Sequence, residues 1–476
     1  MIDATGRPEP AFFVSRLLGT LEDEPVFCAV RAVAPQGATW LVGGVLRNAA
    51  LGLAPGRDYD LVVRGRPWPV ARELARRLGA AAFVLDRESG TSRVVVKDDG
   101  GPWTVDIAPL RGGAIASDLA LRDFTVNAMA VPLGAPSLVD PLGGLADAAA
   151  GRLRPCSPSA IDDDPLRALR AVRLSQTLGL AIDEGLLAIM RRRGALLARV
   201  SRERVGEETL KIFSASGTAE ALGLLFDTDL MAAVFEQTRS WRDLEGYDLT
   251  AHVLSVVAEA DSLLAEIGQG AFGDELRVFF GGSLGAVPMA AMLKLCAFVH
   301  DMGKPAAMSR EGGELRFRGH ELTGAGLAGE AAMGLRLGRR LARELSVVTR
   351  NHHRVFVLAA LDAPSARTRA HFFRAVGGET GLVLLVLAVA DARATRGVED
   401  EGLRKVVGHM VRFYYDVYAR RRPEPLLTGR DVMEIFSVDQ GPEVGRILSL
   451  IAEGQERGEV SDRDGAVRYV RRRLGR

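Results

Sequence analysis

The sequence predicts a multidomain α+β protein, with a mixed α/β head followed by a long and almost entirely helical remainder. Strand and turn signals concentrate before about residue 150 and nearly vanish after it. All seven histidines lie in the C-terminal half, and several follow apolar helical runs. The stretch at 420–430, RRRPEPLLTGR, is typical of a linker and introduces a last helical piece. We therefore expect four domains, at residues 1–148, 149–245, 246–420 and 421–476.

Composition sets broad limits on the function. The net charge of +1 predicts no global basic field, so a nucleic-acid partner has to be held by local patches. The cysteines Cys28, Cys156 and Cys296 lie far apart without metal-type spacing, which favours a reducing compartment. The N-terminus lacks a signal-peptide pattern, and the longest apolar run, Leu382 to Ala390, is too short to span a bilayer. We expect a cytoplasmic protein with no membrane partner, and the sequence leaves its oligomeric state open.

The predicted head begins with an amphipathic helix and a short loop over residues 11–40. A strand then starts at Leu41 and turns through Gly43-Gly44, and a second strand follows the turn Ala54-Pro55-Gly56. The remaining predicted elements of the head are a helix from Pro69 to Leu78 and strands at Ala82–Leu85, Arg93–Val96 and Trp103–Ala108.

The second strand, Asp58 to Val63, carries the most informative pair of residues. Side chains alternate faces along a strand, so Asp58 and Asp60 point the same way and Tyr59 points opposite. Paired carboxylates repel unless a cation lies between them, and oxygen ligands of this kind suit Mg²⁺. The glycines just upstream offer unobstructed backbone N–H groups for a triphosphate. Together these features predict a nucleotidyl-transfer site.

Two further stretches of the head carry candidate site residues. Alternation places Thr104, Asp106 and Ala108 on one strand face, so Asp106 is either a third carboxylate beside the pair or a solvent-facing residue of an edge strand. The run Leu121 to Val131 is expected to pass from strand into helix. Its polar residues could meet a nucleotide's phosphates and ribose, or Asp123 could simply cap a helix.

From about residue 150 the pattern is helical, beginning with a strong helix from Ile161 to Leu180. Asp164 is expected at its N-cap, and Arg167, three residues later, on the same face. An Asp acceptor beside an Arg donor matches the base edges of cytosine and adenine and mismatches those of uracil and guanine. The alternative is a capping Asp164 with Arg167 paired to Asp163 or Asp164. Further helices are expected at 184–195 and 201–214.

Five ordered motifs over residues 38–215 resemble the bacterial class II tRNA nucleotidyltransferase family of CCA-adding enzymes and poly(A) polymerases. The motifs are the GG…R…DxD signature at residues 43–60, RDFTVNA at 122–128, DPLGGL at 140–145, DDDPLRALRAVR at 162–173 and SRERVGEETLK at 201–211. The family commonly has Asp directly after the motif's Arg, where this chain has Asn48.

The resemblance implies roles for the matching residues. It implies a polymerase-β-like nucleotidyltransferase head and a helical neck and body. The resemblance makes Asp58 and Asp60 the metal ligands, expected to hold Mg²⁺. Asp106, which lies in none of the motifs, is expected from its strand face as a third catalytic carboxylate. Asp164 and Arg167 are expected to select CTP and then ATP. The other residues expected at the nucleotide are Gly43, Gly44, Arg47, Arg122, Asp123, Asn127 and Arg170.

A second constellation lies within residues 250–391. His300-Asp301 follows an apolar helix, His252 lies on an earlier helix, and Asp391 falls within an apolar run where a carboxylate requires a cation or partner. The pattern resembles an HD domain, a metal-dependent phosphohydrolase fold. His320 and His352-His353 match its secondary positions more loosely. We expect a divalent metal at His252, His300, Asp301 and Asp391.

The expected reaction is template-independent addition of CCA to the 3′ end of tRNA from CTP and ATP. A CC-adding or A-adding partial enzyme and a poly(A) polymerase share the motifs and stay open as alternatives. An alternative of another class is an HD phosphohydrolase that acts on RNA ends or nucleotides, with the head as a binding module.

Overall fold

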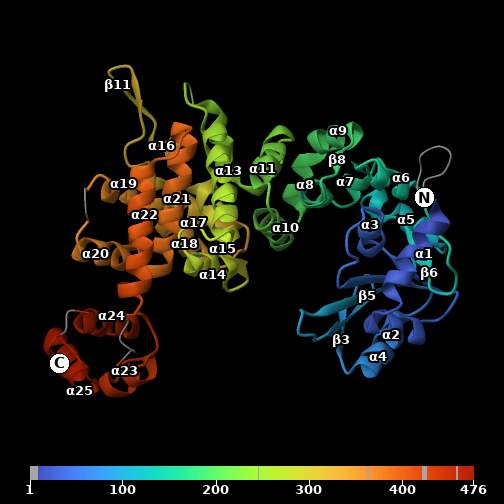
Figure 1. Cartoon of the computed structure of the whole chain (residues 1–476), viewed down its shortest axis with the longest axis horizontal. Coiled ribbons are helices and arrows are strands. Elements are labelled where there is room, and N and C mark those ends of the chain that lie inside the picture. The colour runs from blue at the N-terminus through green and yellow to red at the C-terminus, as the bar shows by residue number, and fades with distance from the viewer. Residues whose placement is uncertain (1–8, 245, 362–363, 421–425, 457–458, 476) are drawn as a thin grey trace. The chain divides into compact units, whose positions relative to one another are not determined.

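The computed structural model describes residues 9–244, 246–361, 364–420, 426–456 and 459–475 (Figure 1). The chain divides into two compact units. The first comprises Met1–Arg242 with Ala331–Gly338, and the second comprises Asp243–Glu330 with Arg339–Arg476. The first unit is mixed α+β and the second is mainly helical, which confirms the predicted fold class.

A six-stranded sheet in the order β3-β4-β5-β2-β1-β6 organises the head. Its strands are β1 (Thr39–Val42), β2 (Asp58–Val63), β3 (Ala81–Asp86), β4 (Thr91–Val96), β5 (Trp103–Pro109) and β6 (Ala130–Pro132). Only the pair β2 and β5 is parallel; the other neighbours are antiparallel. The predicted strands are confirmed, and β5 lies inside the sheet rather than at its edge.

The two faces of the sheet are different. Tyr59, Leu61 and Val63 of β2 belong to a large core that also contains side chains from the first four helices. Val62, on the opposite face, packs in a smaller cluster with residues of β1 and β6. Strand alternation therefore turns Asp58 and Asp60 away from the main core, toward the side that the small cluster only partly fills.

The helices of the head largely follow the sequence pattern, with two corrections. They are α1 (Pro10–Leu21), α2 (Pro25–Val33), α3 (Gly44–Ala50), α4 (Pro67–Leu78), α5 (Ile115–Ala120) and α6 (Gly144–Ala149). Residues 11–40 form two helices rather than one, because Pro25 starts a second helix at its favoured N-terminal position. Leu121 to Val131 runs from a 3₁₀ turn (Thr125–Asn127) into β6, which is the reverse of the predicted order.

The rest of the first unit is helical apart from a two-stranded parallel pair. Its elements are β7 (Arg152–Leu153), α7 (Ala160–Asp163), α8 (Arg167–Leu178), β8 (Ala181–Ile182), α9 (Glu184–Arg193), α10 (Arg202–Ser214), α11 (Thr218–Asp227) and α12 (Met231–Val234). The predicted helix at 201–214 is confirmed, and its N-cap Ser201 accepts the backbone N–H of Arg204. The predicted single helix at 161–180 is wrong, because the backbone is extended at Asp164.

The second unit is a helical bundle with two small hairpins. Its elements up to residue 351 are α13 (Leu249–Gly268), α14 (Asp274–Gly281), β9 (Ser283–Leu284), β10 (Val287–Pro288), α15 (Met289–Val299), α16 (Lys304–Ala307), β11 (Ser309–Glu311), β12 (Glu314–Arg316), α17 (His320–Gly334) and α18 (Arg339–Asn351). They are followed by α19 (Arg354–Ala359), α20 (Ala366–Val376), α21 (Gly378–Arg396) and α22 (Glu401–Phe413). α13 packs against both α15 and α21, and nearly all of α21 is buried, so the apolar run Leu382 to Ala390 forms core.

The C-terminal helices have a core of their own. They are α23 (Gly429–Phe436), α24 (Pro442–Glu456) and α25 (Arg463–Leu474), and Val432, Ile447 and Tyr469 are among the side chains that they bury together. The linker predicted at 420–430 falls partly on residues 421–425, which lie outside the described residues.

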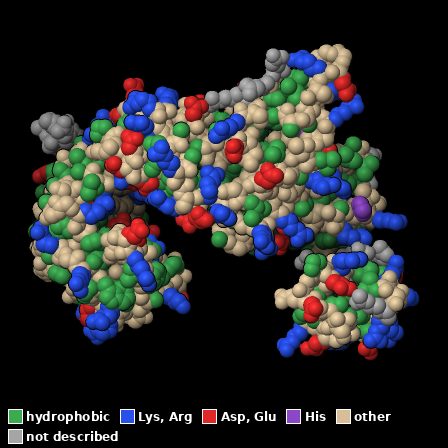
Figure 2. Space-filling view, turned by 180° about the vertical axis from the view of Figure 1, so that it is seen from behind, with side chains coloured by type: hydrophobic (Ala, Val, Ile, Leu, Met, Phe, Trp, Pro, Cys, Tyr) green, Lys and Arg blue, Asp and Glu red, His purple; other side chains and the backbone are tan. Residues whose placement is uncertain are grey.

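Basic and acidic side chains are interspersed over the face shown in Figure 2, in agreement with the near-neutral net charge. Among the described residues, no single helix is long and apolar enough to cross a bilayer. α20 and α21 are long and apolar enough only when they are taken together, and the chain bends by 103° between them.

Candidate active site and histidine-carboxylate cluster

The predicted carboxylates meet on neighbouring strands. β2 and β5 are in parallel register, with Asp58 opposite Thr104 and Asp60 opposite Asp106. The Thr104 hydroxyl donates to the Asp58 carboxylate. Asp58 is exposed and Asp60 is half-buried, so one carboxylate faces solvent while the other borders the protein interior. The structure therefore brings all three carboxylates to one face of the sheet.

Asp106 lies beside Asp58 and Asp60, but the charge of its carboxylate is already balanced by Arg93. Arg93 of β4 donates to both of its carboxylate oxygens, at 2.6 and 2.7 Å. The alternative of a solvent-facing edge-strand residue is wrong, since β5 lies between β4 and β2. Sequence reasoning missed Arg93. Its place on the strand antiparallel to β5, directly opposite Asp106, is the signal that could have found it.

The glycine turn approaches Asp60 closely. Gly43 has φ +76°, and a Cβ at this position would lie 2.7 Å from Asp60 Oδ2, so only glycine fits here without a shift. Burial raises the pKa of Asp60, and the charges of Asp106 and Asp58 add to this effect. Arg122 and the backbone N–H of Gly44 oppose it. A divalent cation between Asp58 and Asp60 would relieve the repulsion, so the donor set fits Mg²⁺.

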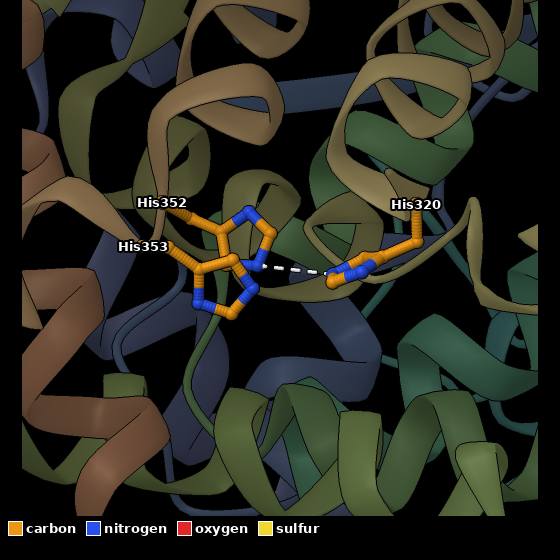
Figure 3. A group of neighbouring side chains, drawn as sticks. All are labelled: His320, His352 and His353. Atoms are coloured by element: carbon orange, nitrogen blue, oxygen red, sulfur yellow. Dashed lines mark hydrogen bonds between the residues drawn. The ribbon is translucent and has the colours of Figure 1, made fainter. Parts of the chain in front are cut away.

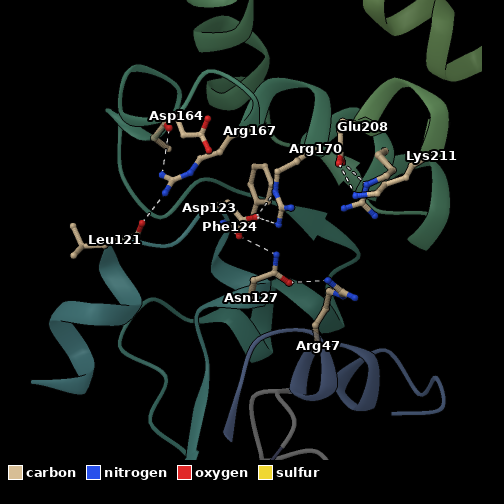
Figure 4. Close-up of polar contacts among 12 residues, drawn as sticks. Arg47, Leu121, Asp123, Phe124, Asn127, Asp164, Arg167, Arg170, Glu208 and Lys211 are labelled. Atoms are coloured by element: carbon tan, nitrogen blue, oxygen red, sulfur yellow. Dashed lines mark hydrogen bonds and ion pairs between the residues drawn. The ribbon is translucent and has the colours of Figure 1, made fainter. Parts of the chain in front are cut away.

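A chain of polar contacts connects α3 to α8 across the turn before β6 (Figure 4). Arg47 donates to Asn127 Oδ1 at 2.9 Å, and Asn127 donates to Asp123 Oδ1 at 2.9 Å. Arg170 closes the chain on Asp123 Oδ2, at 2.6 and 3.0 Å. Asp123 is buried, yet Arg170 and Asn127 hold its pKa below the ordinary value. These contacts fix the relative positions of head and neck side chains around the site.

Arg47 is also held by its neighbour Asn48. The Asn48 side-chain oxygen accepts two N–H groups of Arg47, at 2.9 and 3.2 Å. Burial lowers the pKa of Arg47 without removing its charge. Arg47 is therefore paired here with a neutral neighbour.

Asp164 and Arg167 do not share a helix face, because the helix breaks between them. Asp164 accepts the backbone N–H of Leu166 at 3.2 Å and pairs with Arg204 at 2.8 Å. Arg167, the first residue of α8, donates to the carbonyls of Leu121 and Ala160, at 2.7 and 3.3 Å (Figure 4). The alternative, in which Arg167 pairs with Asp163 or Asp164, is wrong, because Arg167 bonds these two carbonyls instead.

Asp164, Arg167 and Arg204 border one cavity of about 370 Å³. It is lined by Ser89, Thr91, Ala108, Pro109, Arg111, Asp118, Leu121, Arg122, Asp123, Asp164, Leu166, Arg167, Arg170 and Arg204. Five arginines and three aspartates line this cavity, so an excess of positive charge remains, which suits an anionic ligand. Arg204 lies within the SRERVGEETLK motif, but the sequence predicts no role for it, because only the break at Asp164 brings the two residues together.

The second unit gathers the other predicted residues. His252 Nε2 lies 3.1 Å from Asp301 Oδ2 and 3.6 Å from Asp391 Oδ1. His300 Nε2 lies 3.2 Å from Asp301 Oδ2, and Lys304 Nζ lies 2.6 Å from the same oxygen. The surrounding imidazoles hold the pKa of buried Asp301 well below its usual range, so the carboxylate is ionised. Of the three histidines that the sequence matches only loosely, His320 and His352 lie with Nε2 at 3.1 and 3.7 Å from Asp301 Oδ1. A ring nitrogen of His353 lies within 4.8 Å of those of His320 and His352 (Figure 3).

Comparison with known proteins identifies the family. A Poly A polymerase head domain profile matches residues 111–154, and a profile described as the probable RNA and SrmB- binding site of polymerase A matches residues 179–242. The CC-adding tRNA nucleotidyltransferase of Geobacter sulfurreducens is 31% identical over 90% of this chain and 91% of its own length. The A-adding tRNA nucleotidyltransferase of Deinococcus radiodurans is 30% identical over 92% of this chain and 96% of its own length.

Solved structures agree on the fold. The Thermotoga maritima CCA-adding enzyme complexed with tRNA aligns over 97% of this chain and 98% of its own, with a TM-score of 0.59 and 20% identity. A CCA-adding enzyme in complex with ATP aligns over 97% of this chain and 98% of its own, with a TM-score of 0.61 and 19% identity. From the five motifs, the carboxylate site and these relatives, we conclude that the chain belongs to the tRNA nucleotidyltransferase and poly(A) polymerase family.

Proposed function

We propose that the protein adds the nucleotides of the CCA end to the 3′ end of tRNA, without a template, from CTP and ATP. The observation that carries this proposal is the paired carboxylate site of Asp58 and Asp60 beside the arginine-lined cavity that contains Asp164 and Arg167. Both substrates of this reaction are polyanions, and the charge of the cavity is complementary to them. We infer a cytoplasmic location from the same substrates.

Asp58 and Asp60 would hold Mg²⁺, with Asp106 and its partner Arg93 fixing the neighbouring strand. When bound, the metal supplies Lewis-acid chemistry that favours attack of a 3′-hydroxyl on the α-phosphate and departure of pyrophosphate. The backbone at Gly43 leaves room for phosphate oxygens close to Asp60. Arg122, whose charge acts on Asp60 and whose side chain lines the cavity, would face the triphosphate. The chain thus contributes position and charge rather than a covalent step.

Base selection is assigned to Asp164 and Arg167. The break before α8 points both side chains at the same cavity, while Leu166 and the carbonyl of Leu121 fix their orientation. A carboxylate accepts more than two hydrogen bonds and a guanidinium has five donors, so these contacts leave capacity for a base edge. Asp123, Asn127 and Arg170 act in this proposal by positioning Arg47 and the neck.

The test is extension of tRNA transcripts that end at the discriminator base, at C or at CC, with CTP and ATP given singly and together. Full CCA addition predicts three nucleotides on the first transcript. A CC-adding enzyme stops after two, an A-adding enzyme extends only the CC-ending transcript, and a poly(A) polymerase makes long A tails on unrelated RNA. A first transcript that never receives all three nucleotides contradicts the proposal of full CCA addition.

A second activity is favoured by the cluster in the second unit. We infer that His252, His300, Asp301 and Asp391 form an HD-type site for a divalent metal that supports phosphohydrolysis. The convergence of their donor atoms around Asp301 supports this, because ionised carboxylates and imidazole nitrogens are metal ligands. Hydrolysis of bis(4-nitrophenyl) phosphate and 4-nitrophenyl phosphate by the full chain, with Mn²⁺ or Ni²⁺, tests it. Absence of turnover with every metal would contradict the hydrolytic role.

A further inference from the structure

The face of the head sheet that carries the three carboxylates, here called the carboxylate face, ends in an aromatic ring. Asp60 of β2 is opposite Asp106 of β5. Asp106 is opposite Arg93 of β4, and Arg93 is opposite Phe83 of β3. Residues directly opposite one another on adjacent strands point to the same face, so these four side chains form one row. β3 is an edge strand of the sheet, and Phe83 is the last member of the row (Figure 1).

Phe83 lies largely uncovered at this edge. It is 45% exposed, whereas Tyr59, an aromatic residue of β2 on the opposite face, is 1% exposed within the large core. An exposed aromatic ring on an edge strand promotes aggregation unless a ligand or partner covers it. Val84 is also exposed, at 44%, but it points to the other face, because its partner Ser92 is opposite Ile107 of the large core. Phe83 therefore offers apolar surface on the carboxylate face, and Val84 does not.

The glycine turn fixes the side of Asp60 on which the proposed triphosphate site lies. Gly43 and Gly44 follow β1, and β1 pairs with β2 on the side away from β5. A Cβ at Gly43 would lie 2.7 Å from Asp60 Oδ2, and the backbone N–H of Gly44 opposes the rise in the pKa of Asp60. The N–H groups that would receive phosphate oxygens are thus on the β1 side of Asp60.

The geometry of the reaction then fixes the side from which the acceptor comes. The attacking and leaving oxygens are roughly in line in phosphoryl transfer. If pyrophosphate leaves on the β1 side, the attacking 3′-hydroxyl has to approach from the β5 side, over Asp106. The nucleotide that carries this hydroxyl extends from there across β4 and β3. Phe83 is two strand spacings, about 10 Å, from Asp106, a distance that a nucleotide spans from its 3′-hydroxyl to the far edge of its base.

We propose that Phe83 is a positioning residue of the transfer reaction, on whose ring the base of the acceptor RNA's 3′-terminal nucleotide stacks. This inference rests on the function proposed above and deepens it, because it names where the acceptor end is held. Stacking on an aromatic ring tolerates every base, since each base has a π-face. A contact of this kind suits an acceptor whose terminal base changes as nucleotides are added.

The surroundings of the ring favour stacking over attraction by charge. Both oxygens of Asp106 accept from Arg93, at 2.6 and 2.7 Å, so this guanidinium is already balanced. The exposed residues that follow Val84 and Leu85 carry both signs of charge, with Arg87 between Asp86 and Glu88. The apolar ring is therefore the feature of this edge that discriminates for a base.

The test measures extension of tRNA transcripts by variants of the full-length protein. Phe83→Ala should raise the KM for the transcript by about 10-fold, while the KM for the nucleotide stays within about twofold. Phe83→Tyr keeps the ring and should restore the KM for the transcript, whereas Phe83→Leu keeps only apolar surface and should not. Val84→Ala, equally exposed on the opposite face of the same strand, is the matched control and should change neither KM.

A second probe locates the base directly. A transcript with 5-iodouridine as its 3′-terminal nucleotide couples on irradiation to an aromatic ring that is stacked on the base. We expect mass spectrometry of the digested complex to find the crosslink at Phe83, and we expect it to be lost in Phe83→Leu. Circular dichroism of each variant establishes that it is folded.

Different outcomes overturn this inference and the proposed function. An unchanged KM for the transcript in Phe83→Ala, or full recovery in Phe83→Leu, removes the stacking role and leaves the proposed function intact. A wild-type dimer in sedimentation velocity that becomes monomeric in Phe83→Ala, with no change in KM, would assign the ring to a contact between two copies of the chain. Failure of the wild-type protein to extend any transcript contradicts the proposed function and this inference together.

Discussion

The two candidate metal sites of this chain offer different types of ligand. The head offers carboxylates on adjacent strands, with Asp58 exposed and the charges of Asp60 and Asp106 countered by Arg122 and Arg93. The second unit offers imidazoles, most of them buried, around one ionised carboxylate. Open oxygen ligands suit a hard ion that arrives with its triphosphate, whereas buried nitrogen ligands suit a metal that stays bound. The difference predicts two sites that can be inactivated separately.

The largest expected effect comes from the head carboxylates. Asp60→Ala removes a metal ligand from the nucleotidyl-transfer site, so nucleotide addition to tRNA should fall by about 10³-fold or more. Hydrolysis of phosphate esters by the second unit should stay within about twofold. Asp99→Ala, an exposed carboxylate on the turn before β5, is the matched control. Equal loss of both activities would show that the sites are not separate.

The converse variant is Asp391→Ala. Loss of one ligand of the HD-type site should reduce metal-dependent hydrolysis by roughly 100-fold, because the cation is then held by fewer donors. Addition of nucleotides to tRNA should be unchanged when it is measured with Mg²⁺. Asp274→Ala, on the exposed side of α14, controls for the loss of a carboxylate. A comparable fall in nucleotide addition would show that the two sites do not act separately.

Smaller effects should come from base selection. Arg167→Ala removes a donor from the cavity but leaves Asp58, Asp60 and Arg122 in place. Discrimination of CTP and ATP against UTP and GTP, measured as ratios of kcat/KM, should fall by about 10- to 100-fold. The kcat/KM for CTP should fall less than these ratios do. Arg192→Ala, an exposed arginine of α9, should change neither quantity, and unaltered discrimination in Arg167→Ala would remove its proposed role.

The smallest effect concerns Asn48. Asn48→Asp places a carboxylate against Arg47, which competes with the triphosphate for that guanidinium. We expect the KM for CTP to rise by about two- to fivefold, with kcat little changed, since a partly exposed ion pair contributes up to about 1 kcal/mol. An unchanged KM would mean that Arg47 acts through Asn127 rather than on the nucleotide. Asn48→Ala separates a direct role of Arg47 at the nucleotide from a role through Asn127, because it removes the contact of Arg47 with residue 48 without adding a charge.

Much of this arrangement could be predicted from the sequence, since it follows from local periodicity. Alternation along β2 places Asp58 and Asp60 on one face, as expected from that strand alone. The sequence left the place of Asp106 open, because it depends on the parallel register of β2 and β5. The apolar context of Asp391 predicted a partner for its carboxylate, and His252 and His300 lie close to it. The positions of Asp58, Asp60 and Asp391 could be predicted because they depend only on the pattern within one strand or helix.

The features that sequence reasoning missed depend on contacts between elements. The break at Asp164 depends on Pro165, which disfavours helical backbone in the residue before it. The predicted N-cap, Asp164, lies two residues before Leu166, the N-cap of α8. Arg93 and Arg204 acquire their roles only through the strand register and the approach of α10 to α8. The meeting of His252, His300 and His320 at Asp301 requires the packing of separate helical segments, which no spacing rule encodes.

The independence of the two sites is tested most directly by their metals. The full chain is stripped with chelator and then given Mg²⁺ alone, and tRNA extension and phosphate-ester hydrolysis are measured on the same sample. We expect extension to return to its original rate while hydrolysis stays absent until Mn²⁺ or Ni²⁺ is added. Recovery of hydrolysis with Mg²⁺ alone, or failure of extension without a transition metal, would contradict it.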